Sequence, residues 1–400
     1  MNNAAVTICS LNYISKALVL RETFLQFNPD DDFYICIVDR KVTVNDIPLD
    51  VKLLWVEDLE VPDLLKHAFA FDVIEFNTNV KPTVLRKLLC DYSKVLYIDP
   101  DVEVFSSFEY VYELLEHEAV VLTPHYTKPI FDGCKPDDID LLKFGAFNLG
   151  FVAVSRHEQS LLFLDWWSER CLELGYYDPP VGLAVDQKWV TLAPAFFDRI
   201  YILKHPGYNV AFWNLHERLL SKRSGVWMVN ELPLVFVHFS SFNAKDPEAI
   251  ANKQNRFAKG DRPDFAELCQ LYASKLLSNE LNSNVLRYSF DYFDNGVYIT
   301  PALRRFYSIY RFSRFNNLNN PFDSQGAVYD FANKNSLVVK GVASQQRITF
   351  KTASDFQRSR KIINIGLRVT LRLLGPVRYY NFMRYLSVIC SIRNQDEVLK

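Results

Sequence analysis

The run of residues 94–105, KVLYIDPDVEVF, constrains the fold of this chain more than any other segment. Its apolar part, residues 95–98, predicts a buried β-strand, because a short apolar run between polar residues is typical of a strand covered on both faces. Two carboxylates follow at once, Asp99 and Asp101, with a proline between them that fixes one backbone torsion. Open α/β sheets bind ligands at the carboxyl ends of their strands. The run therefore predicts an acidic site at such an edge, with the oxygen ligands that Mg²⁺ and Mn²⁺ take.

Strand-like and helix-like patterns alternate along the first two thirds of the chain. The expected strands are residues 5–10, 32–38, 51–56, 95–98, 119–123, 147–154, 199–203 and 234–238. The expected helices in this part are residues 14–27, 82–90, 158–174 and 185–192. Such alternation implies right-handed crossovers, so we expect an α/β fold with a mostly parallel, Rossmann-like sheet flanked by helices.

The sequence changes in character after about residue 262. A chain of 400 residues is too long for one ordinary core, so a main domain with an appendage is expected. Helical patterns dominate the last third, at residues 265–277, 301–310 and 357–374. We therefore expect a nucleotide-binding α/β domain over residues 1–262 and a mainly helical C-terminal region over residues 263–400.

Composition argues against several classes of protein. A hydrophobic content of 49% indicates a folded globule, and a net charge of −2 gives no general attraction to nucleic acid, so no nucleic-acid partner is expected. The seven cysteines include no CxxC pair, which supports neither a zinc site nor a disulfide framework. No signal-peptide pattern opens the chain, and no run reaches the roughly 20 apolar residues of a membrane span. We expect a cytoplasmic protein.

Charge is uneven, because residues 357–395 include no Asp or Glu. The segment 357–390 carries, among apolar residues, Arg358, Arg360, Lys361, Arg368, Arg372, Arg378 and Arg384. Such a segment can lie on an anionic membrane, which would place the protein peripherally on the inner face of the membrane. The alternative is a helix that packs on the main domain with its arginines in water.

Five pieces of sequence, in order along residues 5–245, carry a resemblance to a known family. They are AVTICSLNYISKALVL, KPTVLRKLL before KVLYIDPDVEVF, FNLGFVAV, DQKW and VFVHFSSF. The chain resembles DXD-containing glycosyltransferases of the GT-A fold, and its layout is most similar to family 8, the group of glycogenin and the bacterial lipopolysaccharide galactosyltransferases. The resemblance implies a metal-dependent enzyme of polysaccharide biosynthesis. Such an enzyme transfers a sugar from a nucleotide-sugar, in the first place a UDP-sugar, to a glycan or lipid-linked saccharide acceptor, with retention.

The resemblance assigns a metal ion to three residues. Asp99 and Asp101 match the metal-binding pair, and His238, at the end of the last apolar strand, matches the third ligand. Two carboxylates and one imidazole suit Mn²⁺, with Mg²⁺ as the alternative. A divalent ion stabilises the charge that develops on the departing nucleoside diphosphate. Taken without the resemblance, the same residues also fit two solvated carboxylates and a structural histidine.

Four positions match the part of the family that holds the nucleoside. Ser10, Asn12 and Tyr13 match the loop around the base, and Asp39 matches an acid that bonds base or ribose. A helix cap or turn is the alternative for Asp39.

Three basic residues match phosphate-binding positions. Lys81 and Arg86 lie before the Asp99 strand and stand too far apart on a helix for both to point inward, so we prefer Arg86; an exposed surface charge is the alternative for either. Members of the family often carry a Gly and then a Lys after the histidine. Here Ser241 and Lys245 stand nearest, with the lysine displaced by one position.

Three more residues match the donor-sugar site and the reaction centre: Asn148, Asp186 and Gln187. Asp186 and Gln187 are also typical of a helix start, where they would act as caps. In retaining members the leaving phosphate is thought to act as base, with an amide or carboxylate nearby, which points to Gln187 and Asp186. Inversion would instead need a side-chain base, and no residue is identified for it. A downstream cluster either lines a sugar site or belongs to the core: Tyr208, Asn209, Trp213, Asn214, Leu215 and His216.

Two other functions stay open at this point. An apolar strand that ends in Asp-x-Asp also marks haloacid dehalogenase-type phosphatases, but Glu103 stands where their motif has Thr or Val, and the motif lies far from the start of the chain. The other alternative is a non-catalytic protein that binds nucleotide-sugars. A nucleotidyltransferase is disfavoured, because no Gly-rich phosphate loop follows the first strand.

Overall fold

The computed structural model of the chain describes residues 3–44, 47–279, 287–339, 357–395 and 397. The chain divides into two compact units, residues 1–290 and residues 291–400. Helix α10 (Pro263–Ser278), which follows the boundary expected at residue 262, buries Phe265 and Leu268 in a hydrophobic cluster of the first unit. The structural division therefore lies later than the expected one, while the functional assignment of the two parts stays a prediction.

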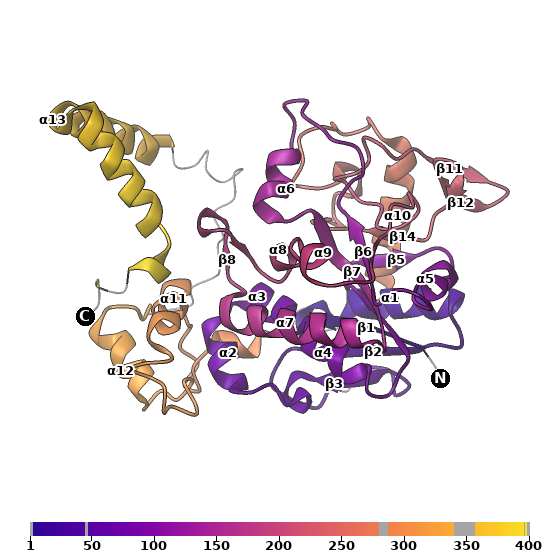
Figure 1. Cartoon of the computed structure of the whole chain (residues 1–400), viewed down its shortest axis with the longest axis horizontal. Helices are drawn as coiled ribbons and strands as arrows, with labels where there is room; N and C mark the ends of the chain where they lie inside the picture. The colour runs from indigo at the N-terminus through magenta and orange to yellow at the C-terminus, as the bar shows by residue number, and fades with distance from the viewer. Residues whose placement is uncertain (1–2, 45–46, 280–286, 340–356, 396, 398–400) are drawn as a thin grey trace. The chain divides into compact units, whose positions relative to one another are not determined.

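A seven-stranded sheet forms the centre of the first unit (Figure 1). Its strands are β1 (Asn3–Cys9), β2 (Asp32–Ile37), β3 (Lys52–Trp55), β4 (Lys94–Ile98), β6 (Val120–Pro124), β7 (Phe147–Ser155) and β10 (Ile200–Ile202). They lie in the order β10-β6-β7-β4-β1-β2-β3, and all neighbours are parallel except β7, which is antiparallel to β4 and β6. The expected α/β fold with a mostly parallel sheet is confirmed.

Helices flank this sheet (Figure 1). Those of the first unit besides α10 are α1 (Ile14–Phe27), α2 (Leu64–Ala70), α3 (Val73–Asn79), α4 (Lys81–Leu88), α5 (Glu109–Leu114), α6 (Asp138–Phe144), α7 (Glu158–Leu174), α8 (Gln187–Val190) and α9 (Ala193–Phe196). The long helices α1 and α7 match the sequence prediction. The short helices α2, α3, α5, α6 and α9 were not predicted, because they span too few turns to repeat an apolar pattern. Capping boxes begin α3 at Asp72 and α6 at Asp137.

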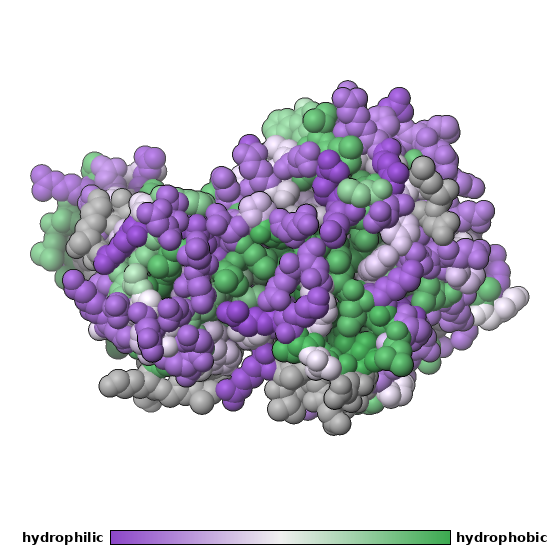
Figure 2. Space-filling view, turned by 90° about the horizontal axis from the view of Figure 1, so that it is seen from below, coloured by the Kyte–Doolittle hydropathy of each residue, from purple (hydrophilic) through white to green (hydrophobic). Residues whose placement is uncertain are grey.

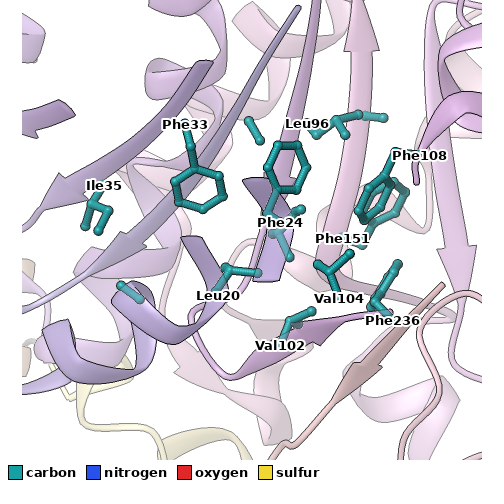
Figure 3. Close-up of a cluster of buried hydrophobic side chains, with 14 of the residues drawn as sticks. Leu20, Phe24, Phe33, Ile35, Leu96, Val102, Val104, Phe108, Phe151 and Phe236 are labelled. Atoms are coloured by element: carbon teal, nitrogen blue, oxygen red, sulfur yellow. The ribbon is translucent and has the colours of Figure 1, made fainter. Parts of the chain in front are cut away.

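Aromatic side chains fill the core between α1 and the sheet (Figure 3). Phe108 is central: its ring lies 5.6 Å from that of Phe24 in α1 and 5.8 Å from that of Phe151 in β7. It also stacks at 5.7 Å on Phe236, which comes from far downstream. This packing holds the segment around Phe236 against the sheet.

That downstream segment is strand β14 (Phe236–His238), which pairs antiparallel with β5 (Val102–Val104). His238 is opposite Val102 in this ladder, and the N–H of Phe239 donates to the carbonyl of Asp101 over 2.8 Å. The pairing therefore places His238 beside the acidic residues that follow β4. Two small sheets complete the strands: β8 (Tyr177–Asp178) with β9 (Leu183–Ala184), and β11 (Leu220–Arg223) with β12 (Val226–Val229) and β13 (Leu232–Pro233).

The second unit is mainly helical, as expected, with α11 (Pro301–Tyr310), α12 (Ala327–Lys334) and α13 (Gln357–Ile389). Helix α13 is interrupted at Gly375, whose φ of +70° lies in the left-handed region, immediately before Pro376. Of the helices that the structure describes, none combines the length and the apolar character needed to cross a bilayer.

Large apolar side chains reach the surface along α13. The most exposed are Ile362, Ile363, Ile365, Leu373, Val377, Tyr380 and Tyr385. Figure 2 shows one face of the molecule, where hydrophobic residues lie among hydrophilic ones. Within α13, Arg358 and Arg360 fall outside the residues whose side chains are described, whereas Arg368, Arg372, Arg378 and Arg384 fall inside them.

Candidate functional site

The two carboxylates flank a tight turn between β4 and β5. The N–H of Val102 donates to the carbonyl of Asp99 over 3.2 Å, which closes the turn, and Pro100 occupies its second position. Proline is favoured there because its fixed φ matches the turn. The N–H of Asp99 donates to the carbonyl of Gly150 on β7 over 2.8 Å, which anchors the turn to the sheet. The turn therefore holds Asp99 and Asp101 at the carboxyl end of β4.

His238 completes a group of three possible metal ligands. Its Nε2 lies 3.1 Å from Oδ1 of Asp101 and 3.6 Å from Oδ2 of Asp99. One donor atom from each residue lies within 4.8 Å of the other two, and in the described part of the chain this is the one such group of acidic, histidine or cysteine residues. Two carboxylate oxygens and an imidazole nitrogen form a donor set that fits Mn²⁺ and accommodates Mg²⁺. The three residues predicted to hold a metal therefore meet at one point.

Charges within this group perturb one another. Burial would raise the pKa of Asp101, but the charge of His238 and its hydrogen bond outweigh burial and hold that pKa well below its usual range. Burial lowers the pKa of His238, and the adjacent Asp101 and Asp99 more than reverse this, so that the net shift is upward. A proton and a divalent cation compete for the same Nε2 lone pair.

A pocket of about 280 Å³ opens beside the two carboxylates. Asp99 and Asp101 line it together with Ser10, Asn12 and Tyr13 from the loop after β1. Helix α3 contributes a second wall: Val73, Ile74, Asn77 and Thr78. The three residues predicted to surround a base thus share one pocket with two of the predicted metal ligands.

Two side chains of the loop after β1 are held in defined positions. The hydroxyl of Ser10 donates to Oδ1 of Asn12 over 2.5 Å. Tyr13 is 45% exposed, and the ammonium of Lys16 lies 4.6 Å from the centroid of its ring. An accessible aromatic face beside a cation is suited to a flat, negatively charged ligand such as a nucleotide.

The side chain of Lys81 is buried, and that of Arg86 lies at the surface. The ammonium of Lys81 is buried, donates to Oδ2 of Asp186 over 2.8 Å and to the carbonyl of Leu149 over 2.7 Å, and lies 4.2 Å from the ring centroid of Tyr97. Arg86 instead pairs with the exposed Asp165 over 3.2 Å, on the surface between α4 and α7. The preference for Arg86 as the inward cation therefore disagrees with the structure, because the buried face of α4 is the one that carries Lys81.

Asp186 and Gln187 make contacts other than helix capping. The Asp186 carboxylate makes no cap hydrogen bond to α8, and burial raises its pKa although Lys81 opposes the shift. The Gln187 amide accepts from the N–H of Leu149 over 3.3 Å and donates to the carbonyl of Phe144 over 2.8 Å. The cap interpretation of Asp186 is therefore not supported.

Asn148 lies between Gln187 and His238. Its Nδ2 is 3.5 Å from Oε1 of Gln187, and its Oδ1 is 3.2 Å from Nδ1 of His238. Asn148 is 7% exposed, so its side chain is buried next to His238. The roles of Asn148, Asp186 and Gln187 toward a donor sugar stay predictions.

Asp39 and Lys245 lie apart from the pocket lining. One carboxylate oxygen of the buried Asp39 accepts from the N–H of Leu11, and the other accepts from the N–H and hydroxyl of Ser289, each over 2.7–2.8 Å. Asp39 thus ties the loop after β1 to residue 289. Lys245 is exposed, and its backbone N–H donates to the Asn243 side chain. Contacts of either residue with a ligand stay predictions.

The downstream aromatic and amide cluster is mostly core. Asn209 and Asn214 are fully buried, and Trp213 is 5% exposed. Trp213 packs edge-on against His238, with ring centroids 5.2 Å apart. Of the two interpretations left open, the structure supports the core one, with the addition that this core supports His238.

Sequence reasoning missed two residues that lie against the group formed by Asp99, Asp101 and His238. The hydroxyl of Tyr97 donates to Oδ1 of Asp99 over 2.5 Å, and a Cβ at Gly150 would lie 2.3 Å from Cε1 of His238. A signal existed for Tyr97, because it precedes Asp99 by two residues at the end of a strand, and side chains two residues apart on a strand point to the same face. Gly150 had only its place inside an apolar strand, where a glycine often marks a close approach.

No protein-family model matches the chain. It is 26% identical over 286 residues to the uncharacterized protein YfnF of Bacillus subtilis (strain 168), covering 69% of this chain and 92% of the relative. It is 25% identical over 244 residues to the uncharacterized protein YfnD of the same organism, covering 59% of this chain and 76% of the relative.

Among solved structures, the chain is similar to the galactosyltransferase LgtC in complex with donor and acceptor sugar analogs, with 14% identity, 68% of this chain and 95% of that chain covered, and a TM-score of 0.43. It is also similar to the glycosyltransferase GlyE of Streptococcus pneumoniae TIGR4, with 15% identity, 70% and 63% covered, and a TM-score of 0.41. For mouse xyloside xylosyltransferase 1 the identity is 11%, the coverage 60% and 98%, and the TM-score 0.35. At these identities and TM-scores the similarity carries no activity over to this chain.

Proposed function

We propose that this chain is a metal-dependent glycosyltransferase that moves a sugar from a nucleotide-sugar, in the first place a UDP-sugar, to a glycan or lipid-linked saccharide acceptor. The observation that carries the proposal is the meeting of Asp99, Asp101 and His238 at the carboxyl end of β4, with their donor atoms within 4.8 Å. The two carboxylates also line the pocket that contains Tyr13.

The chemistry required of such a site is charge stabilisation on a departing diphosphate. A bound Mn²⁺ or Mg²⁺ supplies it as a Lewis acid. Asp99, Asp101 and His238 would hold the ion, and Tyr97 would orient Asp99 through its hydroxyl. In this proposal the exposed ring of Tyr13 takes the nucleobase by stacking.

We propose a supporting role for the buried pair Lys81–Asp186 and for Gln187 in placing the donor sugar. The ion pair with Lys81 opposes the rise that burial gives to the pKa of Asp186. Gln187 is fixed by hydrogen bonds to backbone groups at Leu149 and Phe144. A fixed amide and carboxylate beside the leaving phosphate suit transfer with retention.

The test is incubation of the purified chain with a panel of nucleotide-sugars and MnCl₂, with free nucleoside diphosphate as the readout. We expect slow metal-dependent hydrolysis of one donor, abolished by EDTA and by Asp101→Ala. The matched control is Asp30→Ala. Asp30 is exposed and precedes β2, so it lies at the amino ends of the parallel strands, away from the carboxyl ends where Asp101 lies. Release of phosphate from p-nitrophenyl phosphate without any donor turnover would favour the phosphatase. Donor binding without turnover, with acceptors present, would favour the binding protein.

We also propose that the basic segment 357–390 brings the enzyme to the inner face of an anionic membrane, where a lipid-linked acceptor would lie. Four described arginines of α13, at 368, 372, 378 and 384, stand among exposed apolar side chains, without an acidic residue between them. Each basic residue near an anionic surface contributes about 1 kcal/mol. Sedimentation with phosphatidylcholine vesicles, with and without phosphatidylglycerol, tests this. Binding to the mixed vesicles should be lost when the four arginines become glutamine; equal binding to neutral vesicles would contradict the proposal.

A further inference from the structure

Hydrogen bonds connect His238 to a series of buried polar side chains. Asn148 contacts His238, Asn209 donates to Asn148, and Asn209 also donates to Thr123 of β6. Asn209 is fully buried, Thr123 is 2% exposed and His238 is 4% exposed. Burying polar groups costs free energy unless their hydrogen bonds are made. We therefore expect this series of side chains to have a structural or functional role.

The orientation of the Asn148 amide follows from its neighbours. Its Oδ1 receives the backbone N–H of Gly150 over 3.2 Å, and a backbone N–H can only donate. The same oxygen accepts from Nδ2 of Asn209 over 3.0 Å. The group that Asn148 presents to His238 is therefore an acceptor.

An acceptor at this point fixes the tautomer of His238. Nδ1 of His238 lies 3.2 Å from Oδ1 of Asn148 and must carry a hydrogen to make this bond. In the neutral ring the hydrogen on Nδ1 leaves the lone pair on Nε2, the nitrogen that faces Asp99 and Asp101. The ring is also confined on other sides, by the edge-on contact with Trp213 and by Gly150, where no side chain would fit.

Asn209 holds Asn148 in turn. Its Nδ2 donates to both Oδ1 of Asn148 and Oγ1 of Thr123, which lies 2.9 Å away. Its backbone φ of +54° is in the left-handed region, where asparagine is among the few tolerated residues. The next residue, Val210, forms a parallel bridge with β14 and accepts from the N–H of His238 over 2.8 Å. The same loop thus fixes both the backbone and the side-chain partner of His238.

We propose that Asn148 and Asn209 are positioning residues that orient His238 as a metal ligand, with Nε2 directed at the cation. The inference rests on the proposed function only in that Asp99, Asp101 and His238 hold a divalent cation. It gives Asn148 a role as the hydrogen-bond partner of a metal ligand, apart from any contact with a donor sugar. Partners of a ligating histidine contribute about 10–100-fold to metal affinity.

The test is a titration with MnCl₂ alone, followed by electron paramagnetic resonance of free Mn²⁺. Asn148→Leu has a similar size but cannot accept a hydrogen bond, and we expect it to weaken Mn²⁺ binding about 10–100-fold. Asn148→Asp keeps the acceptor and should retain affinity close to wild type. Asn209→Ala removes one hydrogen-bond donor to Asn148 and leaves the side chain of His238 unchanged, so it should give a smaller loss of Mn²⁺ affinity. It replaces Asn148→Leu as the test variant if Asn148→Leu does not fold.

A double-mutant cycle separates orientation from packing. In a His238→Ala background, Asn148→Leu should have no further effect on Mn²⁺ affinity, because its effect passes through the ring. The proposal is overturned if Asn148→Leu leaves Mn²⁺ affinity unchanged, or if Asn148→Asp loses as much Mn²⁺ affinity as Asn148→Leu. It is also overturned if Asn148→Leu still lowers Mn²⁺ affinity in the His238→Ala background.

The outcome is separable from that of the proposed function. Donor turnover by wild type with unchanged Mn²⁺ affinity in Asn148→Leu would remove the inference alone. The expected variant pattern without turnover of any nucleotide-sugar would remove the proposed function alone.

Discussion

Replacing Lys81 by methionine should destabilise the first unit strongly, because it leaves a buried carboxylate without its counter-ion. Lys81 is 1% exposed and Asp186 is 2% exposed, with 2.8 Å between Nζ and Oδ2. Removing one partner of a buried ion pair costs about 3–5 kcal/mol. At about 2–4 °C per kcal/mol for a larger domain, the midpoint of thermal unfolding should fall by roughly 10 °C. Methionine fills most of the space of lysine, so little of this loss would come from a cavity.

Urea unfolding followed by tryptophan fluorescence measures this loss, since all six tryptophans lie in the first unit. The matched control is Arg86→Met on the same helix, whose exposed pair with Asp165 should contribute no more than about 1 kcal/mol. The double variant Lys81→Met/Asp186→Leu removes both charges and should recover most of the stability. The reasoning is refuted if Lys81→Met loses no more stability than Arg86→Met, or if the double variant is as unstable as the sum of the single ones.

The pH dependence of the same variant follows from the shift of Asp186. Burial raises the pKa of Asp186 and Lys81 lowers it, so removal of Lys81 leaves a pKa raised further above that of the unfolded chain. Below the unfolded pKa the carboxyl is protonated in both states and costs nothing. As the pH rises, the unfolded chain releases the proton first, and the penalty grows. The stability difference between wild type and Lys81→Met should therefore be smaller near pH 4 than at pH 7; an equal difference would contradict this.

Three further changes probe the site and its support. Gly150→Ala places a Cβ 2.3 Å from Cε1 of His238, which should cost about 1–3 kcal/mol in urea unfolding and lower Mn²⁺ affinity; unchanged values would show that the ring has room to move. Tyr97→Phe removes the hydrogen bond to Asp99, worth about 0.5–1.5 kcal/mol, so titration should show Mn²⁺ binding several-fold weaker with an unchanged fold. Lys275→Met leaves the buried Glu103 without its partner, and the stability of the first unit should fall at pH 7. A loss equal to that of an exposed lysine would show that Glu103 is neutral there.

Local patterns in the sequence were sufficient to predict where in the fold the site lies. The apolar residues 95–98 form the centre of β4, and the carboxylates that follow meet the loop of Ser10 and Tyr13 at one pocket. This works because parallel neighbouring strands end at the same edge of the sheet. The order of motifs along the chain was enough to associate these pieces.

What the sequence could not supply was long-range pairing and helix phase. His238 reaches Asp101 because β14 pairs with β5, a three-residue strand too short for a recognisable pattern. The choice between Lys81 and Arg86 depended on which face of α4 is buried, and that face is the one that packs against α7 and β4. Likewise, nothing near Asp39 in sequence indicates Ser289, which occupies one of its oxygens.

The central claim is that Asp99, Asp101 and His238 grip a divalent cation on which a nucleoside diphosphate binds. The most direct measurement is anomalous diffraction from crystals of the full chain grown with MnCl₂ and UDP. We predict one manganese peak in contact with all three side chains and with the diphosphate. A UDP bound elsewhere, or a manganese peak that does not touch His238, would contradict the account.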